Sequence, residues 1–309
     1  MKKTHTLGVV VLDALSGPLG EYPERKGRTQ SVTKSVRFLP GGGAANTACS
    51  LAKMGLAAGV FSKLGDDFAG RFLLEEIGRS GVETSGIRLS KSDSTPFTFV
   101  GIHEDGDRTF IHTPGANLTF APEDVDLDRL LAADFLLYCD LWCKPRLDGP
   151  PGAAILAEAR RRGVVTLLDE CFGLGPDRVQ LEPMLPHCDY FVPSLDDMRV
   201  IYPGASAGQV ADTLLAGGAK TVVLKMGGEG CLVACGRQRV RVPAFPTRVV
   251  DATGAGDSWD AGFLAALAHG EDVATAARIG NAAASFCIQA VGGASGIPAY
   301  EVVREKAAG

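Results

Sequence analysis

The chain has 309 residues, of which 46% are hydrophobic and 22% are charged, and its formal net charge at pH 7 is −5. These values are typical of a globular protein with one large α/β domain or two small ones. The negative charge argues against a nucleic-acid binder, which needs a basic face. No apolar run approaches the roughly 20 residues of a transmembrane helix, which argues against a membrane-spanning protein.

The N-terminus is interpreted as the first strand of a cytoplasmic protein. Residues 7–12 are almost continuously apolar, as in a strand buried on both faces of a parallel sheet. The run is too short for a signal peptide, and no small-residue cleavage site follows it. Asp13 comes directly after it, where ligands bind in open α/β sheets. It is either a ligand-binding carboxylate or a simple turn residue.

Two segments depart from a regular βαβ pattern. Residues 14–38 carry several glycines and prolines and then alternate in polarity, so no crossover helix is expected there. Residues 96–102 and 108–112, with a turn at 104–107, predict a β-hairpin. We expect the two segments to pair into a small sheet over the substrate, where a lid excludes water from the reaction.

A Gly-rich turn, Pro40-Gly-Gly-Gly-Ala-Ala-Asn46, leads into a helix of small residues. Asn46 lies in the first turns of this helix, where propensity gives an amide no reason to be. After a strand at 59–62, a second helix is expected at 68–79.

From residue 134 onward, short strands alternate with helices, which predicts a parallel sheet. The strand at 164–168 ends in Asp169 and Glu170, at the edge of such a sheet where function is usually found. The remaining elements are strands at 134–138, 190–193 and 220–225, a helix at 153–162, and a hairpin of 231–234 with 239–242.

The eight cysteines are interpreted as free thiols in a reducing compartment. Cys139 and Cys143, like Cys231 and Cys235, are close in sequence, but neither pair is C-x-x-C or has a histidine at metal-ligand spacing. No metal cage is predicted.

The most informative stretch is Asp251-Ala-Thr-Gly-Ala-Gly-Asp257, a Gly-rich turn before a helix at 261–268. Backbone N–H groups and the helix dipole make such a turn an anion site for a transferring phosphoryl group. Gly254 and Gly256 let the backbone approach the anion. Asp257 would repel the anion, which makes sense if it accepts the proton of an attacking hydroxyl. The alternative is an ordinary acidic residue in a first helical turn.

Together, the two Gly-rich stretches resemble the ribokinase-like (PfkB) carbohydrate kinase family. The Gly-Gly-x-x-x-Asn element of the family is matched at 41–46, and its Asp-Thr-x-Gly-Ala-Gly-Asp element at 251–257 except for Ala252. The resemblance covers essentially the whole chain. It implies one three-layer α/β/α domain, 1–309, with a mainly parallel central sheet and a small β-sheet lid from insertions at about 14–38 and 95–114. In the family, such a lid is often the contact of a homodimer.

The resemblance also implies ATP-dependent phosphorylation of a hydroxyl on a sugar or sugar-like substrate, with Mg²⁺ and possible use of K⁺. Asp257 is then the general base, and the turn formed by Gly254, Ala255 and Gly256 stabilises the phosphoryl charge. The substrate hydroxyls are expected to contact Asp13, Gly42, Gly43 and Asn46. The nucleotide is expected near Lys225, Gly227, Gly230 and Asn281, although Lys225 also fits a solvated strand end and Asn281 fits plain packing. A monovalent cation is expected at Asp251, Thr253 and Ser295.

One element departs from the family pattern. After the strand at 190–193, the family usually reads Asn-x-x-Glu and positions hydrated Mg²⁺, whereas this chain reads Ser194-Leu-Asp-Asp197. Asp197 keeps the charge on a shorter arm, so a water-mediated contact with Mg²⁺ is expected there. Ser194 also fits a helix N-cap, and both roles are compatible.

Three rival functions are weighed. A nucleoside kinase of the same fold would be favoured by Phe97 or Phe110 reaching in from the lid to stack on a base. A sugar or nucleotide sensor without turnover is supported only by Ser194, and Asp257 argues against it. A dinucleotide-dependent oxidoreductase lacks its G-x-G-x-x-G after the first strand, and the absence of a Walker motif excludes a P-loop enzyme.

Overall fold

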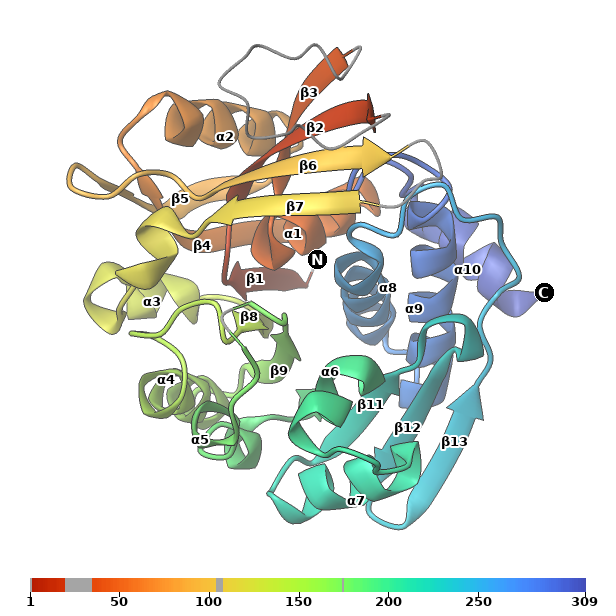
Figure 1. The fold of residues 1–309 in the computed structure, drawn as a ribbon. Helices are drawn as coiled ribbons and strands as arrows, with labels where there is room; N and C mark the ends of the chain where they lie inside the picture. The colour runs from red at the N-terminus through yellow and green to blue at the C-terminus, as the bar shows by residue number, and fades with distance from the viewer. Residues whose placement is uncertain (1, 20–34, 104–107, 174) are drawn as a thin grey trace.

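The structure is a computed structural model that describes residues 2–19, 35–103, 108–173 and 175–309. The described strands form two sheets (Figure 1). The larger has the order β13-β12-β11-β10-β9-β8-β1-β4-β5, and the smaller has the order β3-β2-β6-β7. The expected turn at 104–107 lies outside the described residues.

The larger sheet is parallel from β5 through to β11, and only β12 and β13 are added to it in antiparallel fashion. This confirms the expected mainly parallel sheet. Its strands are β1 (Lys3–Leu7), β4 (Ala57–Gly65), β5 (Glu83–Ser90), β8 (Phe135–Leu141), β9 (Val165–Glu170), β10 (Tyr190–Phe191), β11 (Thr221–Lys225), β12 (Cys231–Cys235) and β13 (Gln238–Val242).

Helices cover both faces of this sheet, because side chains alternate along each strand between two separate cores. In β8, for example, Leu137 and Cys139 pack into one core, while Leu136 and Tyr138 pack into the other. The first face carries α1 (Gly43–Lys53), α2 (Phe68–Arg79), α8 (Ala255–His269), α9 (Val273–Cys287) and α10 (Tyr300–Ala308). The second carries α3 (Leu127–Leu130), α4 (Pro150–Arg161), α5 (Arg178–Leu181), α6 (Leu195–Ile201) and α7 (Ala207–Ala216). The three-layer α/β/α prediction is confirmed.

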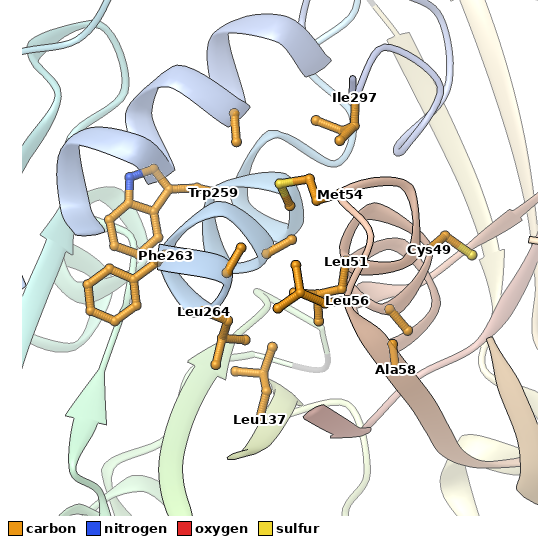
Figure 2. Close-up of a cluster of buried hydrophobic side chains, with 14 of the residues drawn as sticks. Cys49, Leu51, Met54, Leu56, Ala58, Leu137, Trp259, Phe263, Leu264 and Ile297 are labelled. Carbon is orange, nitrogen blue, oxygen red and sulfur yellow. The ribbon is translucent and has the colours of Figure 1, made fainter. Parts of the chain in front are cut away.

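The core of the first face holds α1 and α8 against the sheet (Figure 2). Leu51 of α1 lies near Leu264 of α8, above Leu137 of β8, and Met54, the C-cap of α1, belongs to the same cluster. Because both helices begin at the same edge of the sheet, this packing places their N-terminal turns close together.

The predicted first strand at residues 7–12 is wrong. The first strand of the large sheet is β1, which ends at Leu7, and β2 (Val11–Leu19) already belongs to the small sheet. The sequence did not predict β1 because this strand buries polar side chains and therefore lacks an apolar pattern. Thr6 donates to the carbonyl of Ala44 at 2.9 Å, and His5 Nδ1 lies 2.8 Å from the carbonyl of Leu130. Partners of this kind make buried polar groups tolerable, and sequence alone does not reveal them.

The small sheet joins the two irregular segments, as expected. β2 pairs with β3 (Ser35–Gly41) in antiparallel and with β6 (Phe97–His103) in parallel, and β7 (Arg108–Thr113) completes the sheet beside β6. Asp13 therefore lies inside a strand of the small sheet and not at the end of a strand of the large one.

Helix α8 begins at Ala255, six residues before the expected start at 261, so the Gly-rich turn is itself the first turn of the helix. α10 begins at Tyr300, after Ala299 as its N-cap. Among the helices of the described segments, none is long and apolar enough to cross a membrane.

Candidate active site

The first turn of α8 is shaped to receive an anion. Gly254 caps the helix in the left-handed conformation, with φ at +74°, and the first helical bond runs from Ser258 N to its carbonyl at 2.8 Å. Ala255 N donates to the carbonyl of Ala252, whereas the N–H groups of Gly256 and Asp257 have no intrahelical acceptor, as at any helix N-terminus. Of the Ala255 and Gly256 N–H groups, that of Gly256 is therefore the one available to bind an anion.

Glycines allow three segments to meet at this turn. A Cβ at Gly254 would lie 2.4 Å from the carbonyl oxygen of Gly293, and a Cβ at Gly293 would lie 2.6 Å from Asn46 Oδ1. Gly293 also accepts a hydrogen bond from Ser258 Oγ at 3.2 Å. The 290–296 loop therefore packs between the N-terminal turns of α1 and α8. Residues 290–296 are rich in glycine, but their sequence does not indicate that Gly293 is the residue that contacts Gly254 and Asn46.

Asp257 and Asn46, the two residues singled out in the sequence, are in direct contact. Asn46 Nδ2 donates to Asp257 Oδ2 at 2.7 Å, and Thr47 Oγ1 donates to the Asp257 backbone carbonyl at 3.2 Å. Burial raises the pKa of the Asp257 carboxyl to about 7, and the charge of Asp140 adds to this rise, while the hydrogen bond from Asn46 opposes it. A carboxylate with a pKa near 7 is suited to accept a proton at neutral pH.

Asp140, at the end of β8, was missed in the sequence. Its backbone has φ at +56°, an uncommon value for a non-glycine residue. Its carboxylate accepts hydrogen bonds from Val9 N at 2.8 Å and Gly43 N at 3.0 Å. It therefore holds the Gly-rich turn before α1 against the connection between β1 and β2. A signal was present, because a carboxylate near the end of a predicted strand is the pattern that singled out Asp169.

Beneath Asp140 lies Lys144, a lysine with no exposed surface. Its ammonium donates to the carbonyls of Cys139 and Asp140, both at 2.6 Å, and lies 3.3 Å from Asp148 Oδ1. Burial raises the pKa of the Asp140 carboxyl, and the charge of Lys144 partly offsets that rise. Lys144 thus stabilises both the unusual backbone and the charge at the end of β8.

Asp13 lines a small hollow between the small sheet and the turn that precedes α8. Burial raises the pKa of its carboxyl to about 7, against the effect of a hydrogen bond from Thr98. A Cβ at Gly41 would lie 2.1 Å from Asp13 Oδ2, so the neighbouring strand must carry glycine here. The hollow is lined by Asp13, Leu15, Leu39, Pro40, Val100, Thr253, Gly292 and Gly293. It therefore brings Asp13 together with the Thr253 turn and the 290–296 loop.

Lys225, at the end of β11, lies beside the anion turn and is not a solvated strand end. Its ammonium contacts Asp169 Oδ1 at 2.8 Å and Asp260 Oδ1 at 3.3 Å, and a Cβ at Gly256 would lie 3.4 Å from its Nζ. Burial alone lowers the pKa of Lys225, but the charges of Asp169 and Asp260 outweigh it and raise this pKa. Lys225 therefore keeps its positive charge next to the first turn of α8.

Carboxylates next to Lys225 offer oxygen ligands of the kind that Mg²⁺ prefers. Glu170 Oε1 accepts a hydrogen bond from Ser194 N at 2.7 Å, while its Oε2 is buried and has no partner in the described ranges. Asp197, in the first turn of α6, is half-buried beside Glu170, and burial raises the pKa of its carboxyl. An orphaned carboxylate oxygen beside Asp197 fits a hydrated divalent cation. Ser194 N-caps α6, as the alternative interpretation held.

The residues predicted for a monovalent cation form part of the scaffold. Asp251 accepts hydrogen bonds from Thr253 N at 2.6 Å and Gly292 N at 2.9 Å, which ties the anion turn to the 290–296 loop. The carbonyl of Ser295 accepts a hydrogen bond from Lys53 Nζ at 3.2 Å. The ammonium of Lys53 already supplies a positive charge next to Ser295. These contacts do not require a bound K⁺, and K⁺ stays a prediction.

The remaining nucleotide candidates lie on the far side of α8. Asn281 donates to the carbonyls of Val242 and Pro243, at 3.1 and 3.0 Å, and accepts from Trp259 Nε1 at 2.8 Å. A Cβ at Gly230 would lie 2.0 Å from the carbonyl of Val242, whereas Gly227 borders open space. These contacts fasten β12 and β13 to α8 and α9. They correspond to the packing role that the sequence left open for Asn281.

Comparison with known proteins gives a consistent result. A model of the pfkB family of carbohydrate kinases matches residues 7–299. An uncharacterised sugar kinase of Archaeoglobus fulgidus is 30% identical over 254 residues, which cover 80% of this chain and 98% of that protein. A nucleoside kinase of Methanothermobacter thermautotrophicus is 29% identical over 91% of this chain and 87% of its own length. The solved structure of Arabidopsis thaliana ribokinase with ribose and ATP has a TM-score of 0.85 at 26% identity and covers 99% of this chain and 98% of its own.

Proposed function

Because the chain belongs to the pfkB family of carbohydrate kinases, we propose that it transfers the γ-phosphoryl group of ATP to a hydroxyl of a sugar or sugar-like substrate. The observation that carries this proposal is the contact of Asn46 with Asp257 at the N-terminus of α8. It places a carboxylate with a pKa raised to about 7 next to free helix N–H groups. Proton acceptor and anion site are then side by side, as phosphoryl transfer to a hydroxyl requires.

In this proposal, the substrate binds between the small sheet and the N-terminal turns of α1 and α8. Asp13 of the small sheet and Asn46 of α1 hold its hydroxyls, and Gly42 and Gly43 allow close approach of the backbone. At Gly42 a Cβ would lie 2.4 Å from the carbonyl of Val9, so this turn requires glycine. The small sheet acts as the lid, and the whole chain acts as one kinase domain.

Asp257 takes the proton of the attacking hydroxyl, which becomes a better nucleophile as the P–O bond forms. Charge on the γ-phosphoryl group is stabilised by Gly256 N–H, the α8 dipole and the ammonium of Lys225. Mg²⁺, when bound with ATP, neutralises the β- and γ-phosphate oxygens. Asp197 and Glu170 would hold its hydration shell.

A nucleoside substrate is the second candidate, and one side chain favours it. Phe110 of β7 lies directly opposite Val100 of β6, and Val100 lines the hollow together with Asp13. Side chains of paired residues share a face, so Phe110, with 56% of its surface exposed, lies on the side of the substrate and could stack on a base. The side chain of Phe97 lies on the other face of the small sheet and packs against the core.

The outer face of the small sheet supports a homodimer formed through the lid. Val36 and Phe38 of β3 and Ile111 of β7 lie on the side opposite to Asp13, and each has about half of its surface exposed, at 49%, 51% and 51%. Large apolar side chains exposed together are typical of a surface that another protein covers.

The test is ATP-dependent ADP release over a panel of pentoses, hexoses, sugar acids and nucleosides. Asp257→Asn should lower kcat by a factor of about 100 or more with the best substrate, because positioned acid–base catalysis contributes about that much. Asp128→Asn, the same change at a side chain that is 86% exposed and pairs with Arg162, is the matched control and should leave turnover unchanged.

Each outcome of the panel decides something different. Turnover on nucleosides alone would make the nucleoside kinase the better proposal. Full activity of Asp257→Asn would remove the assignment of the base. Silence on every substrate, with ATP binding intact, would favour a sensor.

A further inference from the structure

Two thiols meet where β8 and β9 end. The parallel ladder pairs Leu141 with Glu170, and Cys171 N donates to the carbonyl of Leu141 at 3.3 Å. Cys143 follows Leu141 by two residues, after a turn closed by the bond from Cys143 N to the carbonyl of Asp140 at 3.1 Å. The backbone therefore brings Cys143 and Cys171 to the same point of the sheet edge.

The side chains are arranged unequally. Cys171 is the thiol next to Cys143, and together with burial it raises the pKa of Cys143. A Cβ at Gly173 would lie only 2.5 Å from Cys143 Sγ, so the chain after Cys171 folds over Cys143. Cys171 is exposed and Cys143 is half-buried, so a reagent in solution reaches Cys171 first.

We infer that Cys143 and Cys171 form a reversible disulfide, which makes the ends of β8 and β9 a site of oxidative modification. The oxidant is a small-molecule disulfide. Attack by the Cys171 thiolate breaks the S–S bond of the reagent, forms a mixed disulfide and releases one thiol. Attack by Cys143 on the Cys171 sulfur then closes the protein disulfide and releases the second thiol. The protein loses two electrons and two protons, and the reagent is reduced to two thiols.

The bond would join two strand ends that carry charged groups of the candidate active site. Asp140 precedes Cys143 by three residues, and Glu170 directly precedes Cys171. A disulfide restricts the unfolded chain, so the oxidised protein should melt at a higher temperature than the reduced one. Reduction with dithiothreitol should reverse this shift.

The test is treatment of the whole protein with oxidised glutathione, followed by alkylation and non-reducing peptide mapping by mass spectrometry. The expected product links the peptides of Cys143 and Cys171 and is two hydrogens lighter than their sum. Cys235 is the matched control, because it is also exposed but lies four residues along a strand from Cys231, about 13 Å away. It should stop at the mixed disulfide with glutathione.

The variant Cys143→Ala removes only the second thiol and should leave glutathione attached to Cys171. A wild-type protein that keeps glutathione on Cys171, as it does on Cys235, would overturn the inference. So would a protein in which Cys143 and Cys171 both remain reduced while Cys235 reacts.

Discussion

The ionisation of Asp257 is set by burial and by neighbouring groups that act in opposite directions. Burial and the charge of Asp140 favour the protonated carboxyl, while the hydrogen bond from Asn46 favours the ionised one, and the resulting pKa is about 7. A general base must be ionised to accept a proton. The ionised fraction of Asp257 rises as the pH increases through 7, and activity should rise with it.

For the wild-type protein, we therefore expect kcat/KM to rise with pH to a plateau, with a midpoint near 7. Asn46→Ala removes a hydrogen bond to the charged form, which should raise the pKa of Asp257 by about one further unit and move the midpoint to higher pH. Thr47→Val is the control, because Thr47 donates to the backbone carbonyl of Asp257 and not to its carboxylate.

Profiles of kcat/KM from about pH 5 to 9 check this prediction. Asn46→Ala should also lower kcat/KM at every pH if Asn46 binds the substrate as proposed, so the midpoint is the informative quantity. A midpoint that stays in place in Asn46→Ala, or moves equally in Thr47→Val, would contradict the assignment of the pKa near 7 to Asp257.

Helix α8 is bounded by two glycines with left-handed backbones, and the two differ in their surroundings. Gly254, the N-cap, has φ at +74° and approaches the carbonyl of Gly293, whereas Gly270, the C-cap, has φ at +87° and open space around it. The same substitution at the two ends therefore separates backbone strain from close packing at the anion turn.

Gly270→Ala should lower the free energy of unfolding by about 1–2 kcal/mol, from the left-handed backbone alone, and leave kcat/KM unchanged. Gly254→Ala should lower the free energy of unfolding at least as much and also reduce kcat/KM by a factor of about 10 or more. The new Cβ would lie only 2.4 Å from the carbonyl oxygen of Gly293, so the turn would have to shift. Urea denaturation and steady-state kinetics measure the two effects. Equal kinetics in the two variants would show that the turn tolerates the displacement.

At the scale of the whole molecule, the two edge strands of the small sheet carry exposed apolar side chains on the face opposite to Asp13. The side chains of Val36, Phe38 and Ile111 project from the outer face. A second protomer would bury this apolar surface, as expected if the lid forms a dimer.

Phe38→Glu should convert a dimer into a monomer, because a carboxylate would be buried without a partner in the contact. Val179→Glu, at a side chain of α5 that is 74% exposed, is the control and should leave the assembly unchanged. Sedimentation velocity of the wild type and both variants distinguishes the cases. A monomeric wild type, or a dimer that persists in Phe38→Glu, would rule out the lid as the contact.

The parts predicted from the sequence are those that local pattern determines. The spacing of glycines and small residues indicated the two helix N-termini, and an amide and a carboxylate with no local reason to be there indicated Asn46 and Asp257. The alternation of strands and helices from 134 onward predicted the parallel sheet, and the two irregular segments predicted the small sheet.

The parts that escaped prediction depend on contacts between distant residues. Asp140 matters because its carboxylate reaches Gly43, 97 residues away in the chain, and nothing near Asp140 in the sequence indicates that partner. Lys144 is fully buried because two backbone carbonyls and Asp148 surround its ammonium. β1 was missed for the same reason, since distant backbone carbonyls bind the buried Thr6 hydroxyl and His5 Nδ1.

The connections between the two sheets have a mechanical consequence. β3 ends at Gly41 and α1 begins at Gly43, so a single residue separates the small sheet from the helix that carries Asn46. A tilt of the small sheet is therefore passed on to the first turn of α1, and from there to the hydrogen bond on Asp257. A ligand bound by Asp13 in the proposed way would set this tilt. Ligand binding in the hollow is thereby linked to the proton affinity of Asp257. The ionised fraction of Asp257 should therefore differ between the empty and the ligand-bound protein.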